Sequence, residues 1–292
     1  MAPMTSWDAL RVFVAVYRAR SFSAAADELG LAQSSVSEQI ARLERNLGHR
    51  LLERSPAGVR PTERGAELLA RIAGPVDALA AATAPSGAEA SRTVFLGGPA
   101  EFLSEVILPA LLRSALPDGV RVAARFGQAE DLVDELRAGA VDVLVSALPV
   151  RGPDLAAEPV YDEEFLLVGA PAWADAADLD AIPVLSYGPE LPIIRRYWRS
   201  VFGRRPEQLD VRLIAPDLRT LLRLASDGAG MTVLPDYLVR EQLASGALVL
   251  LHQPELAPLN TIYVATRKPP ALPDPAVLTV RASVVAAARS AR

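Results

Sequence analysis

Residues 21–48 read SFSAAADELGLAQSSVSEQIARLERNLG and hold two helix patterns separated by a glycine. We expect Ser23 to cap the first helix, which runs to Leu29, and Gly30 to end it in the left-handed conformation. In the second pattern one apolar stripe recurs at helical spacing as far as Gly48 and consists of Val36, Ile40, Leu43 and Leu47. Two short helices joined by a tight turn predict a helix-turn-helix unit.

The segments on either side extend this unit. Before it, one buried face of a further helix is indicated by Leu10, Phe13, Val14 and Tyr17. After it, residues 51–62 lose the helical period and read as a strand, a turn at 55–58 and a second strand. Arg54 and Arg60 lie on the two arms of this small β-wing. We therefore expect a winged helix-turn-helix domain over residues 1–62.

A long helix with one apolar stripe follows the wing. Thr62 is a good N-cap for it, and Pro75 is expected to kink it. The stripe is too apolar to face water alone and is formed by Leu69, Ile72, Val76 and Leu79. It either pairs with a second copy of the chain or packs against its own wing domain. The sequence APSGA at 84–88 is typical of a linker, so we place the linker helix and hinge at 63–91.

Short apolar runs alternate with helical patterns after residue 92. The strand candidates are 94–97, 120–126, 141–146, 165–169, 184–186, 211–214, 232–234 and 261–266. The helix candidates are 102–114, 129–138, 192–202, 217–226, 236–244 and 275–289. This alternation predicts an α/β domain with mostly parallel strands, so the fold class is α/β with an all-α N-terminal part.

Composition excludes several classes of site. With no cysteine and two histidines among 292 residues, neither a disulfide, nor a thiolate metal site, nor a histidine-rich metal site is expected. No apolar run reaches the roughly 18 residues of a membrane span and no export signal is visible, so we expect a cytoplasmic protein without membrane contact. The net charge is −5, but arginine exceeds acidic residues slightly within 1–64, a weak indication of a polyanionic partner.

Several blocks at consistent spacing resemble the LysR-type transcriptional regulator family. They are WDALRVF at 7–13, SFSAAA at 21–26, QSSVSEQI at 33–40, the segment 47–54, and Thr62 with Gly65. More weakly, EPVYDEE at 158–164 and GAGMTVLP at 228–235 are similar to two landmarks of that family's effector-binding domain.

The resemblance implies a particular domain organisation. The long helix would be a dimerisation helix, and 92–292 would form a periplasmic-binding-protein-like effector domain. Subdomain one would comprise 92–160 with 265–292, and subdomain two 161–264, with crossovers near Val160-Tyr161 and Tyr263-Val264. A homodimer or homotetramer would bind double-stranded promoter DNA at an interrupted palindrome.

The polar face of the second helix of the unit would enter the major groove, since a helix fits its width. The DNA-contact candidates there are Gln33, Ser34, Ser35, Ser37, Glu38 and Arg42. Arg54 and Arg60 would contact phosphates. Glu38 either accepts a hydrogen bond from cytosine N4 or pairs with Arg42 at i,i+4, and the pair is favoured. Taken singly, each of these residues also fits a solvated helix face. Ala32 stands where the family usually has a capping serine.

A small-molecule effector would lie in the cleft between the subdomains, near strand ends that face helix N-termini. The candidates are Pro99, Ala100, Glu101, Phe102, Gly127, Gln128, Ser146, Tyr187 and Pro216. Taken singly, each of these residues fits a packing role about as well as a ligand-binding role. Many relatives carry a hydroxyl where Ala100 and Glu101 stand, which argues against a simple carboxylate effector. Glu101 either favours a hydroxyl, amine or cation on the effector or caps its own helix.

Two other classes of protein compete with the regulator. A small-molecule-converting α/β enzyme with a helical appendage would need a base and nucleophile, and the sequence pairs none. A solute-binding protein would need an export signal. We therefore expect neither enzymatic activity nor a cofactor.

Overall fold

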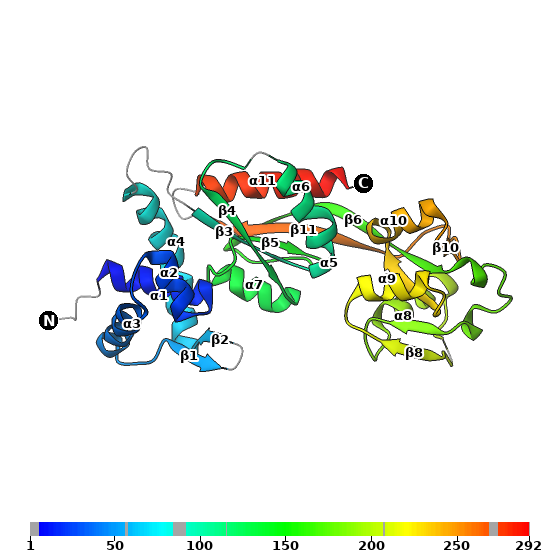
Figure 1. Ribbon diagram of the computed structural model, residues 1–292, viewed down its shortest axis with the longest axis horizontal. Helices are drawn as coiled ribbons and strands as arrows, with labels where there is room; N and C mark the ends of the chain where they lie inside the picture. Colours follow the sequence, from blue (N-terminus) through cyan, green and yellow to red (C-terminus); the bar gives the residue numbers. More distant parts are fainter. Residues whose placement is uncertain are drawn as a thin grey trace.

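The computed structural model describes residues 6–55, 58–83, 92–114, 116–206, 208–268 and 274–291. An N-terminal helical domain, subdomain one and subdomain two follow one another along the long axis of the molecule (Figure 1). The predicted linker at 84–88 lies outside the described residues, as do Pro56 and Ala57 of the predicted wing turn.

The N-terminal domain consists of α1 (Trp7–Ala19), α2 (Phe22–Leu29), α3 (Gln33–Leu47), β1 (Leu52–Ser55), β2 (Gly58–Pro61) and α4 (Glu63–Thr83). Gly30 and Gly48 end α2 and α3 with positive φ, as predicted. The predicted cap Ser23 is wrong. Ser21 has the extended backbone of an N-cap, and its Oγ accepts a hydrogen bond from the Ala24 N–H at 3.3 Å. α4 continues through its internal Pro75.

The wing is attached both to α3 and to α4. Glu44 Oε1 accepts hydrogen bonds from the N–H groups of Leu51 at 2.8 Å and Leu52 at 3.2 Å. Thr62 Oγ1 accepts one from the Gly65 N–H at 3.0 Å, which caps α4 as predicted. A Cβ at Gly65 would lie 2.0 Å from the Leu51 carbonyl oxygen, so only glycine fits there. The wing and α3 are thus fixed relative to α4.

A mixed sheet runs through both subdomains and has nine strands among the described residues. They are β3 (Arg92–Gly98), β4 (Val120–Phe126), β5 (Val143–Ser146), β6 (Leu155–Gly169), β7 (Val184–Ser186), β8 (Val211–Ile214), β9 (Met231–Pro235), β10 (Val249–Leu250) and β11 (Leu259–Arg267). The order is β4-β3-β5-β11-β6-β9-β7-β8, with β10 paired to β6.

The expectation of mostly parallel strands holds only for β3, β4 and β5 in subdomain one and for β7, β8 and β9 in subdomain two. β3 is parallel to β4 and β5, and β7 is parallel to β8 and β9. β6 and β11 are instead antiparallel to each other and to their outer neighbours. The reason is topological, because β6 carries the chain from subdomain one to subdomain two and β11 returns it.

Helices cover both faces of the sheet in subdomain one. α5 (Ala100–Phe102), a π-helical turn (Leu103–Ile107), α6 (Leu108–Arg113) and α11 (Pro275–Ser290) lie on one face, opposite α7 (Ala129–Arg137) (Figure 1). The helix predicted at 102–114 is therefore divided into pieces. Pro109 contributes to the division, because it has no N–H to continue the α-helical hydrogen bonds.

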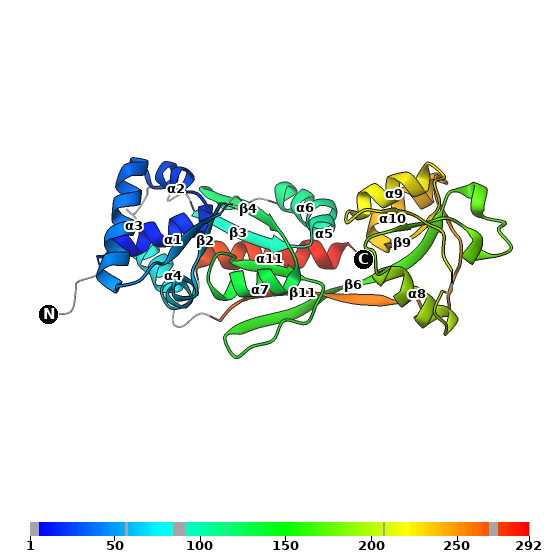
Figure 2. The same cartoon turned by 90° about the horizontal axis from the view of Figure 1, so that it is seen from below.

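Subdomain two carries the remaining helices: α8 (Pro192–Phe202), α9 (Leu218–Ser226), α10 (Asp236–Ser245) and the 3₁₀ turns Pro171–Trp173 and Leu179–Ala181. Figure 2 shows β6 and β11 running side by side from one subdomain to the other. Their register shifts between Ile262 and Tyr263, which pair with Tyr161 and Pro159, so Val160 is the extra residue of a β-bulge. This irregularity lies where the sequence placed the crossovers.

Candidate DNA-contacting surface and effector cleft

α3 presents one polar face to solvent because its other face is completely used in packing. Val36, Ile40 and Leu43 are 0–3% exposed in the core of the N-terminal domain. On the other side four candidates are exposed and two are half-buried: Gln33, Ser34, Glu38 and Arg42, then Ser35 and Ser37. Ala32 gives α3 no side-chain cap. The first N–H groups of α3 therefore remain available to an anion such as a DNA phosphate.

A shallow hollow of about 250 Å³ adjoins the start of α3. It lies between α2, α3 and the wing and is lined by Arg20, Ser21, Phe22, Ser23, Gln33, Gly58 and Val59. Sequence reasoning missed the hydroxyls and the arginine of this group as contact candidates. Arg20 and Ser21 precede α2 and Ser23 lies in its first turn, and only the folded arrangement places them beside α3 and the wing.

The remaining DNA candidates differ in what the structure says of them. Arg60 is exposed on β2, with Glu53 as its register partner on β1. Arg54 belongs to β1, but its side chain lies outside the described part of the chain. Glu38 and Arg42 form no ion pair among the described residues, so the pair favoured by their i,i+4 spacing is absent here.

The predicted dimerisation stripe on α4 is split by the structure. Leu69 is 0% and Val76 5% exposed, and both lie in the buried cluster of the N-terminal domain. Ile72 packs half-buried against that cluster, whereas Leu79 is 45% exposed. Leu69 and Val76 thus pack within their own chain, as the second interpretation of the stripe expected, and offer no surface to a partner.

Three of the nine effector candidates are buried, and they are Phe102, Ser146 and Glu101. Phe102 is 1% exposed, and its ring centroid lies 5.5 Å from that of Tyr161 and 5.2 Å from that of Tyr237. Ser146 is 1% exposed, and its Oγ donates to the Leu148 carbonyl at 2.8 Å and accepts from the Leu148 N–H. Phe102 therefore serves the core and Ser146 a tight turn, which removes them from the set that offers atoms to a ligand.

Glu101 connects the two subdomains. It lies in the first turn of α5, is 8% exposed, and its Oε1 accepts a hydrogen bond from the Leu218 N–H at 3.1 Å. Leu218 is the first residue of α9 in subdomain two, next to the N-cap Asp217. Neither expectation for Glu101 described this contact. The Glu101 carboxylate does not cap its own helix α5. It caps the N-terminus of α9 in the opposite subdomain, where the helix dipole favours negative charge.

A second contact crosses the cleft beside Glu101. The Gln128 side chain, after β4, lies beside the side chain of Tyr187, after β7. Burial raises the pKa of Tyr187, the nearby Glu101 carboxylate raises it further, and Gln128 is close enough to lower it slightly. Three predicted residues therefore lie close together between the subdomains. For four more candidates the structure gives the exposure, two half-buried and two exposed: Pro99 and Ala100, then Gly127 and Pro216.

A buried carboxylate that the sequence did not single out lies on the crossover strand β6. Glu163 is 6% exposed, and its Oε1 accepts a hydrogen bond from Asn260 Nδ2 at 3.1 Å. Burial raises the pKa of Glu163 to about 7, against the lowering effects of Asn260 and Arg196. The charges of Asp236 and, to a smaller extent, Glu101 add to the increase. No periodicity could have revealed this residue, because in the sequence it is one carboxylate among the several of residues 158–164.

Comparison with known families matches both halves of this architecture. Residues 7–66 match the bacterial regulatory helix-turn-helix protein, lysR family, and residues 87–289 match the LysR substrate binding domain. The chain belongs to the LysR family of transcriptional regulators.

Relatives of this LysR-type regulator cover nearly its whole length. The HTH-type transcriptional regulator AbaB of Streptomyces antibioticus is 43% identical over 88% of this chain and 90% of its own. The crystal structure of ArgP from Mycobacterium tuberculosis has a TM-score of 0.73 at 23% identity and covers 96% of both chains. Full-length LysG from Corynebacterium glutamicum with bound effector arginine has a TM-score of 0.68 at 23% identity over 98% of both.

Membership assigns the two halves their general roles. The N-terminal domain of a LysR-type regulator binds DNA and the α/β domain binds an effector, so the protein is a transcriptional regulator and not an enzyme. Across the described ranges no group of His, Cys, Asp and Glu has the arrangement of a metal site. Nor does any described helix combine the length and apolarity of a membrane span.

Proposed function

We propose that this LysR-type regulator binds promoter DNA as a homodimer or homotetramer, with α3 of two copies in successive major grooves of an interrupted palindrome. The observation that carries the proposal is the free polar face of α3 opposite a fully buried apolar face. The half-buried Ile72 and exposed Leu79 on α4 remain for the contact between copies. Binding to DNA would place the protein in the cytoplasm.

Base reading and phosphate binding are divided between α3 and the wing. Gln33 suits adenine, and Arg42 suits guanine or a phosphate. Because Glu38 is unpaired with Arg42, its carboxylate is free to accept a hydrogen bond from cytosine N4. Ser34, Ser35 and Ser37 contribute hydroxyls on the same helix, and Arg54 and Arg60 bind phosphates from the wing.

The salt dependence of DNA binding tests the wing. Arg60→Ala should weaken specific and random DNA alike and reduce the slope of log K against log salt by about one, because one fewer counterion is released. Fluorescence anisotropy with the chain's own upstream DNA measures both. Arg212→Ala, which removes an exposed arginine of subdomain two, is the matched control. An unchanged slope for Arg60→Ala would remove the wing from the interface.

The effector would bind between the subdomains, where Glu101, Gln128 and Tyr187 meet. A carboxylate of the chain already occupies the N-terminus of α9, and Ala100 offers no hydroxyl to a ligand carboxylate. We therefore propose an effector that presents an amine, a guanidinium or a hydroxyl to Glu101. Arginine, the effector in the LysG structure, belongs to this class and is the first probe.

A thermal-shift screen tests this effector class. Arginine, lysine and amino alcohols should raise the melting temperature in a concentration-dependent way, since a ligand that binds the folded state stabilises it. Simple monocarboxylates should not. Stabilisation by monocarboxylates alone would overturn the assignment of the cleft chemistry.

A further inference from the structure

The N-terminal domain packs directly against subdomain one of its own chain. The contact is the turn that follows α7, where Ala138 and Ala140 belong to the same buried cluster as the core of α1 and α4. Gly139 has φ +75, and a Cβ there would lie 2.4 Å from the Ala73 Cβ of α4. The two domains are therefore in backbone-level contact, closer than any other residue type would allow.

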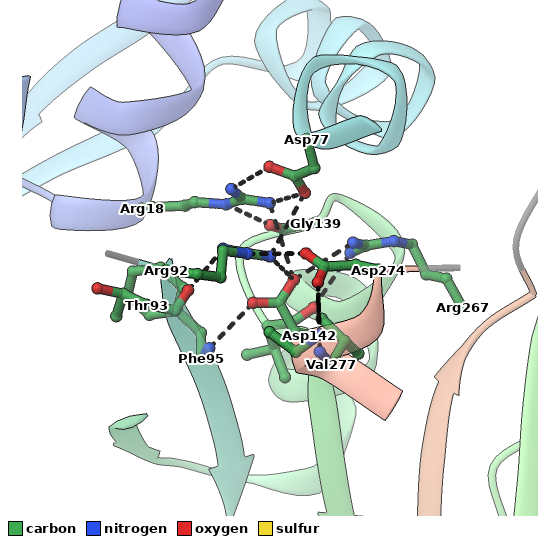
Figure 3. Close-up of polar contacts among 12 residues, drawn as sticks. Arg18, Asp77, Arg92, Thr93, Phe95, Gly139, Asp142, Arg267, Asp274 and Val277 are labelled. Carbon is green, nitrogen blue, oxygen red and sulfur yellow. Dashed lines mark hydrogen bonds and ion pairs between the residues drawn. The ribbon is translucent and has the colours of Figure 1, made fainter. Parts of the chain in front are cut away.

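A buried arginine ties α1 to both sides of this contact. Arg18 is 7% exposed, and its two terminal nitrogens each lie 2.7 Å from a carboxylate oxygen of Asp77 on α4. Its Nε donates a hydrogen bond to the Gly139 carbonyl of subdomain one at 2.9 Å (Figure 3). This bidentate geometry fixes the orientation of the guanidinium as well as its position.

Asp142 belongs to the effector domain and pairs with arginines of the same network. Its side chain is 1% exposed and accepts a hydrogen bond from the Phe95 N–H at 3.0 Å. Arg92 Nη2 lies 3.2 Å from Asp142 Oδ1, Arg267 Nη2 3.5 Å and Arg18 Nη2 3.8 Å. One carboxylate thus joins the starts of β3 and β5, the end of β11, and α1 of the N-terminal domain.

Arg92 completes the network by contacting three carboxylates. Its Nη2 lies 3.7 Å from Asp77 and 3.2 Å from Asp142, and its Nε donates to Asp274 at 2.8 Å. Asp274 is in turn the N-cap of α11. We call the following group the docking cluster: Arg18, Asp77, Arg92, Asp142, Arg267 and Asp274. It contains as many arginines as aspartates, so its charges balance.

The arginines of the docking cluster keep the Asp77 carboxyl ionised although it is buried. Burial alone would raise the pKa of this carboxyl, but attraction and hydrogen bonding from Arg18, with help from Arg92, lower it. Glu135 extends the contact outside the cluster by pairing with Arg20 of the N-terminal domain and with Arg125 of subdomain one. The ion pairs of the docking cluster are numerous and mostly buried, so they belong to the packed interior and not to the solvated surface.

We infer that the docking cluster holds the DNA-binding domain and subdomain one together as one unit. Arg18 and Asp77 are then positioning residues that set where α3 lies relative to the effector cleft, without touching DNA or effector. The docking follows from the contacts alone, and only its meaning for DNA recognition rests on the proposed function. On effector binding, subdomain two would then move relative to this unit, to which β6 and β11 join it.

The test is a distance measurement within one full-length chain. Because the chain has no cysteine, Arg45→Cys on α3 and Glu130→Cys on α7, both exposed positions, introduce the only two labelling sites. Spin-labelled protein is mixed with an excess of unlabelled protein, so that measured distances lie within one chain, and no DNA is added. Failure of the DNA proposal therefore cannot affect the result.

The labelled parent should give one narrow distance distribution. Arg18→Met and the isosteric Asp77→Asn should each widen it at least twofold, and circular dichroism checks that the variants remain folded. Arg64→Met, which removes the exposed arginine of the Arg64–Glu67 pair on α4, is the matched control and should leave the width unchanged. A broad or two-peaked parent distribution, or a narrow distribution in both cluster variants, would overturn the inference.

A second measurement separates positioning from general loss of stability. Amide hydrogen exchange at Gly139 and Ala140 should become at least tenfold faster in Asp77→Asn, whereas exchange in β9 of subdomain two should stay within twofold. Equal acceleration at both places would mean that the variant destabilises the whole chain and that Asp77 positions nothing.

Discussion

The contact between the DNA-binding domain and subdomain one differs in kind from the contact between subdomains one and two. Between the DNA-binding domain and subdomain one lie the docking cluster and the apolar contact of α4 with the turn after α7. Between subdomains one and two, besides the strands β6 and β11, the contacts described above are Glu101 with the first N–H of α9, Gln128 beside Tyr187, and the ring of Phe102 with that of Tyr237. The first contact balances several buried charges, whereas the second joins one carboxylate to a backbone N–H and otherwise packs neutral side chains.

This difference indicates where the molecule can change shape at low cost. Removing one member of a balanced buried ion cluster leaves its partners uncompensated, which costs several kcal/mol. Exchanging one hydrogen bond for a bond to ligand or water costs about 1 kcal/mol. An effector whose affinity for two arrangements differs by about 1–3 kcal/mol, the usual range of allosteric coupling, can therefore reshape the cleft but cannot separate the DNA-binding domain from subdomain one.

The largest effect that this comparison predicts is at Asp142. Asp142→Ala leaves the arginines around it without a buried counter-charge, and we expect it to lower the free energy of unfolding by about 3–5 kcal/mol. Urea unfolding followed by circular dichroism measures this. The control is Asp134→Ala, whose 79% exposed side chain pairs with Arg137 and should matter by less than about 1 kcal/mol. Equal effects at both positions would mean that the docking cluster is no stronger than a surface pair.

At the cleft, Glu101→Gln should have a smaller and ligand-specific effect. It should weaken binding of arginine or another effector with an amine by about 1.5–3 kcal/mol, the contribution of a charged hydrogen bond. DNA binding without effector should stay the same, because the docking cluster is untouched. Calorimetry compares this variant with Glu241→Gln, an exposed glutamate of α10. Wild-type affinity in Glu101→Gln would remove this residue from the effector site.

The polar face of α3 lies outside both contacts. Variants of this face should therefore change DNA binding without affecting either contact. Gln33→Ala should cost specific DNA binding about 1–3 kcal/mol and random DNA much less, since one base contact is lost. Effector binding and unfolding should not change. Gln208→Ala, in subdomain two, controls for the loss of an exposed amide. Equal weakening on specific and random DNA would mean that Gln33 positions the helix without reading a base.

The last predicted effect is a pH dependence at the crossover. Because the folded pKa of Glu163 is raised from 4.5 to about 7, the folded state binds a proton that the unfolded state releases. Its stabilising contribution is therefore fully present below about pH 4.5 and is lost as pH rises to 7. We expect the free energy of unfolding of Glu163→Gln to fall less over this window than that of the parent, by at most about 3 kcal/mol. An unchanged pH profile in this variant would assign the dependence to other groups.

Local patterns predicted the elements that depend on nearby residues. The apolar stripe of α3 and the two glycines that end α2 and α3 specified the helix-turn-helix, and from it the exposed face of α3 follows. Where two local solutions were equivalent the prediction was wrong, as for Ser21 and Ser23, which offer hydroxyls two positions apart. The apolar stripe on α4 predicted that Leu69 would be buried but could not say against which surface.

Contacts between distant segments could not be predicted in the same way. Arg18 and Gly139 are separated by 121 positions, and Arg92 and Asp274 by 182. In the sequence each of these arginines and aspartates is typical of an ordinary surface charge. The bond from Leu218 to Glu101 was likewise hidden, because it depends on how closely the two subdomains approach. Long-range burial, rather than residue type, distinguishes these side chains from their exposed counterparts.

At the contact between Gly139 and Ala73, one added methyl group would push the DNA-binding domain and the effector domain apart. An alanine at Gly139 has no room, so the DNA-binding domain would have to shift away from the effector domain. Mutants selected for an altered or effector-independent response should therefore recur at this pair. They would change neither the surface that reads DNA nor the cleft that holds the effector. Evolution could thus reset the coupling between signal and promoter while leaving both kinds of recognition intact.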